Sequence, residues 1–324
     1  MTTVQTELYG SVAAELPRVC DLLDAQLASD DACVQALLGK VAPQHGKMLR
    51  PALVLLSGRA LGRCTEDHYA LAAVVEMIHM ASLVHDDVID EADARRNMPS
   101  ANRTLGNEGA VLLGDYIVSA AFRLCNSLRS HEANDIFGGT CNMICLGELI
   151  QVAHRRNLQL SEAEYLDIIA KKTAGLIRAC AVFGAVFADA DARCVDRLAE
   201  YGHNLGMAFQ ITDDVLDFTG DQRQLGKPVG SDLRQGLLTL PALSYRDANP
   251  GDERLARIAD HGRPPEAMIL GLIADIVGSG AIQASLEEAE RFGRKARQCL
   301  ETLPESPYRR ALEELAEFTL ARNR

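Results

Sequence analysis

Apolar residues recur along this chain at spacings of three and four, which is the pattern of helices that bury one face. Runs that alternate apolar and polar residues, as strands do, are nearly absent. The pattern therefore predicts an all-α protein. Helices are predicted over residues 7–28, 31–38, 52–61, 67–91, 107–128, 134–154, 161–187 and 191–218. About four or five more should follow as far as Arg322, giving a bundle of roughly ten or more.

Several residues mark where these helices should begin. Pro17 must open or bend the first helix, and Pro51 suits a first helical turn. Ser161 followed by Glu164 forms a capping box. Segments rich in glycine, proline, asparagine or charge are predicted to be loops: 39–47, 92–106 and 219–235.

Three aspartates, Asp86, Asp87 and Asp90, end the long apolar segment that precedes them. On a helix, Asp86 and Asp90 lie one turn apart on one face, so their carboxylates converge. Like charges this close repel each other unless a cation lies between them. The same spacing recurs downstream in Asp213, Asp214 and Asp217. One acidic helix end is usually solvated surface, but two matching copies favour a shared function.

Carboxylate oxygens without soft ligands suit Mg²⁺, which takes one or two carboxylates and prefers substrate phosphates for the rest. Two such clusters therefore predict a polyphosphate held between them. Free N–H groups at a helix start and the planar fork of arginine suit phosphate oxygens. The candidate cations, each a weak signal alone, are Lys47, Arg50, Arg95, Arg96, Lys172 and Lys227.

A di-iron helical bundle is a competing interpretation. Glu76 with His79, and Glu200 with His203, have the Glu-x-x-His spacing that such a centre needs. That interpretation leaves both aspartate clusters unexplained, and Gly202 weakens the second motif.

Composition narrows the class of protein. With 324 residues, 48% of them hydrophobic, and no linker-like stretch, the chain is predicted to form one domain over residues 1–324. The net charge of -12 argues against nucleic acid as a partner. Nine cysteines without a Cys-x-x-Cys pair indicate neither a disulfide framework nor a thiolate zinc site, and fit the cytoplasm. No signal-peptide pattern and no uncharged run of about 18 residues is found, so no transmembrane segment is expected.

The chain resembles the trans-isoprenyl diphosphate synthases of the polyprenyl synthetase family over nearly its whole length. The resemblance rests on an ordered set of motifs: Gly46-Lys47-x-x-Arg50-Pro51, Glu76-x-x-His79, Asp86-Asp87-x-x-Asp90, Arg95-Arg96, Lys172-Thr173, Phe209-Gln210-x-x-Asp213-Asp214-x-x-Asp217 and Gly226-Lys227-x-x-Gly230-x-Asp232-Leu233. Residues 303–312 further resemble the octaprenyl branch. The family resemblance implies a single-domain isoprenoid-synthase bundle around a deep central cavity, and a homodimer.

The same resemblance implies roles for individual residues. About two or three magnesium ions would hold an allylic diphosphate. Asp86, Asp90 and Asp213 would bind these ions, and Asp87, Asp214 and Asp217 would support those three aspartates. The allylic substrate would also contact Arg95, Lys172, Thr173, Gln210 and Lys227. Isopentenyl diphosphate would lie in a metal-free pocket made by Lys47, Arg50, His79 and Arg96. Catalysis would depend most on Asp86, Asp90, Lys172, Asp213 and Lys227.

The implied activity is that of a long-chain trans-polyprenyl diphosphate synthase, which adds isopentenyl units head to tail onto an allylic diphosphate with Mg²⁺. An octaprenyl-type product for quinone side chains is expected, and this lipid would bring the enzyme to membranes. The alternatives are a farnesyl or geranylgeranyl synthase, a terpene cyclase, and a subunit of a heteromeric synthase. A cyclase would not need the second diphosphate pocket, and a regulatory subunit would usually have lost aspartates.

Product length should depend on the helix before the first aspartate cluster, along which the growing tail would run. Ala81 and Ser82 lie about one turn above Asp86, where short-chain relatives have a bulky aromatic residue. These small residues predict an open tunnel and a long product, with Phe122 as a candidate floor.

The chain departs from the family pattern at two positions. Leu237 stands where many members have a lysine, in Gly236-Leu237-Leu238-Thr239, so one expected diphosphate cation is absent. Asn97 replaces a usual glycine after the arginine pair. The loss of the lysine would weaken the closed active site or mark a subunit that works with a partner.

Overall fold

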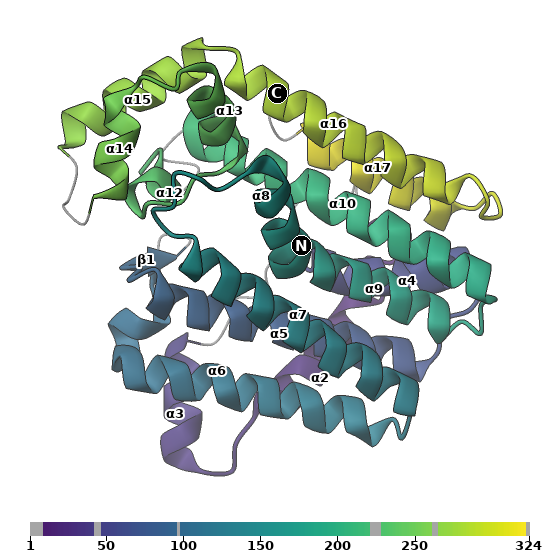
Figure 1. Ribbon diagram of the computed structural model, residues 1–324. Coiled ribbons are helices and arrows are strands. Elements are labelled where there is room, and N and C mark those ends of the chain that lie inside the picture. The colour runs from purple at the N-terminus through teal and green to yellow at the C-terminus, as the bar shows by residue number, and fades with distance from the viewer. Residues whose placement is uncertain (1–8, 42–46, 96–97, 221–227, 261–264, 322–324) are drawn as a thin grey trace. The chain divides into compact units, whose positions relative to one another are not determined.

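The computed structural model describes residues 9–41, 47–95, 98–220, 228–260 and 265–321, and these are mostly helical (Figure 1). The elements are α2 (Leu16–Leu27), α3 (Ala32–Val41), α4 (Leu49–Ala60), α5 (Glu66–Ile89), β1 (Ala94–Arg95), β2 (Met98–Pro99), α6 (Ala101–Ser127), α7 (His131–Ala153), α8 (Glu162–Ile169), the π-helix η1 (Ala170–Ala174), α9 (Gly175–Val186), α10 (Ala192–Thr219), α12 (Ser231–Arg234), α13 (Leu240–Ala248), α14 (Glu253–Ala259), α15 (Glu266–Gly278), α16 (Ala281–Leu300) and α17 (Pro307–Ala321). The all-α prediction is confirmed, because the strands among these described residues form a single short hairpin.

The chain divides into two compact units. Unit 1 comprises residues 1–142, 176–202 and 297–315, and unit 2 comprises residues 143–175, 203–296 and 316–324. Several helices, among them α7 and α10, contribute residues to both units. That the whole chain forms one domain stays a prediction.

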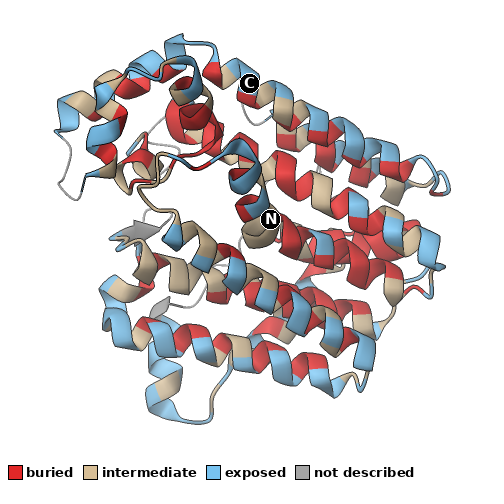
Figure 2. Cartoon of the chain, viewed as in Figure 1, coloured by how far each residue is buried: buried red, intermediate tan, exposed pale blue. Residues whose placement is uncertain are grey.

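Unit 1 is organised around α5, which contacts α2, α4 and α6. Every residue from His68 to Ile78 is buried, so this helix has no solvent-facing stripe there (Figure 2). Its start is fixed by a capping box between Thr65 and His68. The ring of His68 also lies 3.2 Å from the Gly184 carbonyl oxygen, and burial lowers the pKa of His68. A helix enclosed in this way holds its last turn, with the first aspartates, in a defined position.

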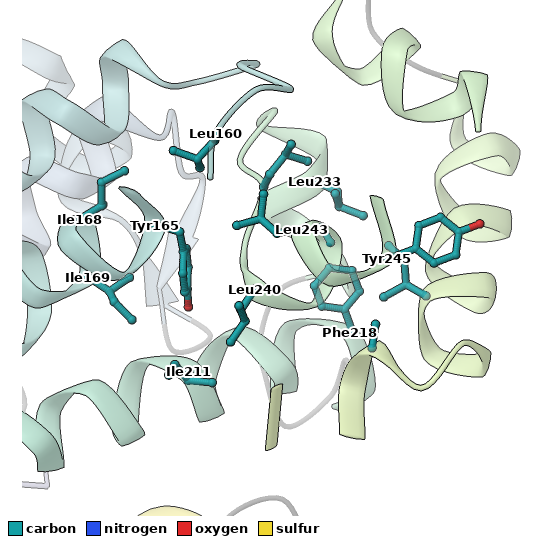
Figure 3. Packing of buried hydrophobic residues seen from close by; sticks show 14 of the residues in the cluster. Leu160, Tyr165, Ile168, Ile169, Ile211, Phe218, Leu233, Leu240, Leu243 and Tyr245 are labelled. Carbon is teal, nitrogen blue, oxygen red and sulfur yellow. The ribbon is translucent and has the colours of Figure 1, made fainter. Parts of the chain in front are cut away.

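Unit 2 is built on a cluster of buried apolar residues from α8, α10 and α13 to α16 (Figure 3). Tyr165, Ile211 and Leu240 are each buried in it. The capping box at the start of α8 is confirmed, since Ser161 Oγ accepts from Glu164 N and the Glu164 carboxylate accepts from Ser161 N at 2.8 Å.

Helix boundaries differ from the predicted ones where proline, glycine or a cap decides them. Pro17 opens α2, so the helix begins at Leu16 and residues 10–15 form turns. The predicted loop 92–106 is wrong in its second half, because α6 begins at Ala101. Gly106, with φ 74° and ψ 166°, interrupts α6 without ending it.

By length and apolar composition alone, α7 could cross a membrane, and α15 with α16 would do so only as a pair bent by 60°. Only 17% of the apolar 18-residue stretch within α7 is buried. This finding among the described residues differs from the expectation of no such segment, which rested on the lack of an uncharged run of about 18 residues.

Candidate active site

The first aspartate cluster occupies the last turn of α5, as the apolar pattern predicts. Asp87 is buried, whereas Asp86 and Asp90 are half-buried. The backbone N–H of Asp90 donates to the Asp86 carbonyl oxygen at 2.8 Å, so the two residues stay in helical register. Asp86 and Asp90 are therefore partly accessible and lie one helical turn apart. Asp87, between them in sequence, faces the protein interior.

His85 connects this last turn of α5 to α6. Its Nε2 lies 3.2 Å from the Val111 carbonyl oxygen and 3.6 Å from Asp115 Oδ1. Gly114 permits the contact, because a methyl group at this position would overlap the imidazole ring. The contact helps to orient the turn that carries Asp86.

The predicted isopentenyl-binding residues lie in unit 1 at the start of α4 and within α5. Lys47 is exposed, and Arg50 and His79 are half-buried. Burial raises the pKa of the Cys180 thiol to about 12, while the charge of Arg50 lowers it and that of Glu76 raises it. Arg50 and Glu76 therefore lie close enough to α9 to influence the same group.

The hairpin after the first cluster carries the predicted arginine pair. Arg95 lies in β1, opposite Met98 in β2. Arg96 and Asn97 lie outside the described residues, as does Lys227 in the loop after α10.

The second aspartate cluster ends α10 and lies in unit 2. Asp213 is half-buried, while Asp214 and Asp217 are 5% and 1% exposed. The Asp214 carboxylate accepts hydrogen bonds from Tyr165 Oη at 2.6 Å and from Gln210 Nε2 at 2.7 Å. Thr173 Oγ1 donates to Gln210 Oε1 at 2.7 Å, so two predicted substrate-binding residues are joined to this carboxylate.

Asp214 titrates unlike an ordinary carboxylate. Burial raises its pKa well above the usual range, the negative charge of Asp232 raises it further, and the hydrogen bonds from Tyr165 and Gln210 act in the opposite direction. Burial and Asp214 also raise the pKa of Tyr165. Asp214 therefore serves to hold neighbouring groups, in contrast to the more accessible Asp213.

Asp217 anchors the segment that follows the second cluster. Its carboxylate accepts from Ser231 Oγ at 3.1 Å and from the Asp232 backbone N–H at 3.2 Å. The short helix α12 is thereby attached to the end of α10.

Lys172 lies in the π-helix η1, where it forms an ion pair with Glu148 of α7. A π turn inside a longer helix often marks a functional position. Gly147 allows α7 to approach η1 closely, since a methyl group there would lie 2.6 Å from the Lys172 backbone nitrogen. Glu148 and Tyr165 were not predicted as site residues. The signal for Glu148 was a lone acidic residue in an apolar stretch of α7.

Gly147→Ala should lower the free energy of unfolding by about 1–3 kcal/mol, because the added methyl group meets backbone atoms of Lys172 that cannot move aside. Gly139→Ala on the same helix is the matched control, since nothing lies within 4 Å of its added methyl group. That control should be neutral or stabilise by up to about 1 kcal/mol. Urea denaturation measures both, and equal effects would contradict the close packing of α7 on η1.

The residues expected to set product length lie in different surroundings. Ala81 is 1% exposed within α5. Ser82 is half-buried and donates its hydroxyl to the His79 carbonyl oxygen at 2.8 Å. Phe122 is 51% exposed on α6, and its ring centre lies 5.8 Å from that of Phe137. Because the ring lies at the surface of this chain, its role as a tunnel floor stays a prediction.

The part of the chain that the structure describes contains no group of three or more His, Cys, Asp or Glu residues placed to hold a metal ion. The di-iron interpretation needs such a group. Glu200 also pairs with Arg197 at 3.1 Å, and 58% of its side chain is exposed. Mg²⁺, by contrast, needs only one or two carboxylates from the protein.

A cavity of about 510 Å³ lies in unit 1, lined by residues that include Arg63, Glu66, Glu132, Phe187 and Asp189. None of its lining residues belongs to the predicted site.

Comparison with known proteins shows the family to which this chain belongs. The chain matches the family described as polyprenyl synthetase over residues 31–274. It is 35% identical to octaprenyl diphosphate synthase of Escherichia coli, covering 92% of this chain and 93% of that protein. It is 37% identical to heptaprenyl diphosphate synthase component 2 of Geobacillus stearothermophilus, covering 95% and 96%.

A solved structure extends the comparison to three dimensions. Polyprenyl synthase from Caulobacter crescentus CB15, complexed with calcium and isoprenyl diphosphate, superimposes with a TM-score of 0.93 at 36% identity, covering 99% of this chain and 98% of that one. The all-α isoprenoid-synthase fold is confirmed by this likeness. Together with the match along residues 31–274, it shows that the chain belongs to the polyprenyl synthetase family of prenyltransferases.

Proposed function

We propose that this protein is a long-chain trans-polyprenyl diphosphate synthase that joins isopentenyl diphosphate repeatedly to an allylic diphosphate, with an octaprenyl-type product. The observation that carries the proposal is the placement of half-buried Asp86 and Asp90 at the end of α5, and of Asp213 at the end of α10, in a chain of this family. Quinone side chains are the expected use of the product, and the cytoplasm the expected location.

The test supplies the purified protein with isopentenyl diphosphate, Mg²⁺ and allylic starters of several lengths, and measures product lengths by mass spectrometry. Products with about eight isoprene units support the octaprenyl assignment. A folded protein that elongates no starter would contradict the proposal, and products that stop at farnesyl or geranylgeranyl length would favour the short-chain alternative.

The donor set of the two clusters fits Mg²⁺. Asp86, Asp90 and Asp213 are half-buried and offer hard oxygen ligands, and Asp87, Asp214 and Asp217 are buried on the same helices. When bound, the metal would neutralise charge on the diphosphate oxygens. About two or three ions are expected for one allylic diphosphate.

The residues of the chain would act by binding and by stabilising charge. Lys172 and Thr173, with Gln210, Arg95 and Lys227, would hold the allylic diphosphate. The allylic C–O bond then breaks and its electron pair leaves with the diphosphate, whose growing charge these donors stabilise. Water must be excluded from the cation that remains.

The second substrate completes the reaction. Lys47, Arg50, His79 and Arg96 would hold isopentenyl diphosphate so that its double bond faces the allylic cation. The double bond attacks, a new C–C bond forms, and one proton passes to the released diphosphate. The product is again an allylic diphosphate, so the cycle repeats without an enzyme nucleophile.

We also propose that the protein is a homodimer that pairs through α6 and α7. Exposed large apolar residues gather on these two helices: Val111, Leu112, Phe122, Leu146, Leu149 and Val152. Large contiguous apolar patches on a protein surface often mark an interface. A dimer contact would also explain why α7 is apolar enough to resemble a spanning helix.

Leu112→Glu should convert the dimer to monomers, because Leu112 is 61% exposed and a charge there would be buried in the interface. Light scattering coupled to size-exclusion chromatography measures the mass. Leu270→Glu on α15, where the leucine is 52% exposed, is the control and should leave the mass unchanged. A wild-type monomer, or a Leu112→Glu dimer, would contradict the proposed interface.

A subunit of a heteromeric synthase is the second candidate, because one relative is named component 2 and Leu237 replaces an expected lysine. Activity of the purified chain alone separates the candidates. Elongation without any other protein supports an enzyme built from this chain alone, whereas full inactivity of a folded chain favours the partnered enzyme.

A further inference from the structure

Leu237 stands where the family motif has a lysine. The segment next to the second aspartate cluster therefore has one cation fewer than the motif supplies. Four carboxylates belong to this region, namely Asp213, Asp214, Asp217 and Asp232, and the Asp232 backbone is hydrogen-bonded to the Asp217 carboxylate. A diphosphate would bring further negative charge to the same place, so an additional cation would stabilise it.

The backbone at Leu237 is tied to the second aspartate cluster. The Leu237 N–H donates to the Asp232 carbonyl oxygen at 2.9 Å, and the Asp232 N–H donates to Asp217 Oδ2 at 3.2 Å. A cation on this segment would therefore act close to the proposed metal ligands.

Arg156 reaches this segment from the turn that follows α7. Its backbone N–H donates to the Gly236 carbonyl oxygen at 2.7 Å. A methyl group built on Gly236 would lie 3.3 Å from Arg156 Nε and 3.5 Å from Cδ, so the arginine side chain crosses the residue next to Leu237. Gly236, with φ 77°, suits this contact because it has no side chain and tolerates the left-handed region.

The backbone of Arg156 is itself strained, since its φ is 65°. Asparagine and glycine adopt this left-handed conformation more readily than arginine does. Strain of this kind tends to persist where a functional site requires it. At Arg156 this conformation coincides with a side chain that lies against Gly236, next to Leu237.

We propose that Arg156 contacts the diphosphate leaving group of the allylic substrate and provides the cation that position 237 lacks. This inference rests on the proposed function. Two N–H groups of the guanidinium would each donate a hydrogen bond to a phosphate oxygen. These bonds strengthen as the C–O bond breaks and charge grows on the diphosphate.

Arg156→Asn should lower kcat/KM for the allylic diphosphate at least about tenfold, and should keep or raise the Tm because asparagine relieves the strain. The affinity for inorganic diphosphate with Mg²⁺, measured by calorimetry, should fall to a similar extent. Arg129→Asn is the matched control, since Arg129 is exposed in unit 1 with φ 54°. It should change neither quantity.

Arg156→Asn/Leu237→Lys should recover most of the lost kcat/KM and diphosphate affinity. Unchanged kinetics and binding in Arg156→Asn would overturn the inference. Failure of the lysine to restore either quantity would also overturn it, by showing that Arg156 acts through the loop structure. If the wild-type chain binds inorganic diphosphate but elongates no starter, the proposed function fails instead, and the binding measurements still test Arg156.

Discussion

Asp86→Asn should lower kcat at least about a hundredfold and shift the Tm by no more than about 2 °C. The half-buried carboxylate of Asp86 is one of the proposed metal ligands, and asparagine keeps its shape while removing its charge. Without that charge, the diphosphate is bound less well as its negative charge grows. Steady-state elongation at saturating Mg²⁺ and substrate measures kcat.

The control for Asp86→Asn is the same change at Asp135 on α7, whose side chain is 73% exposed. That variant should keep full activity. If Asp86→Asn retains more than about half of the wild-type kcat, the first cluster is not the metal site.

Ala81→Phe should shorten the main product by several isoprene units, because the new ring would occupy the space that the growing tail follows. Ser82→Phe should act in the same direction, since Ser82 is half-buried about one turn above Asp86. Mass spectrometry of the dephosphorylated alcohols gives the product lengths. Ala81→Ser, which adds only a hydroxyl group, is the control and should leave the distribution unchanged.

A shorter product must be distinguished from a damaged enzyme. Ala81 is 1% exposed, so a ring that meets packed side chains in place of a tunnel would cost about 1–3 kcal/mol of stability. Unchanged product lengths in both phenylalanine variants, with an intact Tm, would show that the tail does not pass these residues.

Local sequence signals predicted the helices and the positions of the aspartates well. Helical periodicity depends on neighbouring residues, so it located the ends of α5 and α10 and placed both clusters there. Ser161 marked the start of α8 for the same reason. The start of α6 was missed because Gly106 suggests a loop, and the backbone indeed leaves the helical conformation there.

Contacts between distant segments could not be predicted in this way. Tyr165 and Asp214 are 49 residues apart, and no local pattern shows that a phenol hydroxyl will bind that carboxylate. The helical period gives the neighbours of Asp214 on α10 but not the helix that covers it. The ion pair of Glu148 with Lys172 was missed for the same physical reason.

The division of the chain into interleaved segments has a consequence for how the protein folds during synthesis. Unit 1 needs residues 297–315 as well as its N-terminal part, and the hydroxyl of Tyr201 donates to the Leu312 carbonyl oxygen at 2.8 Å within it. An emerging chain can form α4, α5 and α6 early, but it cannot complete their unit until α17 leaves the ribosome. Native contacts between residues so distant in sequence slow folding. The apolar surfaces of unit 1 stay exposed until these contacts form, and chaperones would bind there.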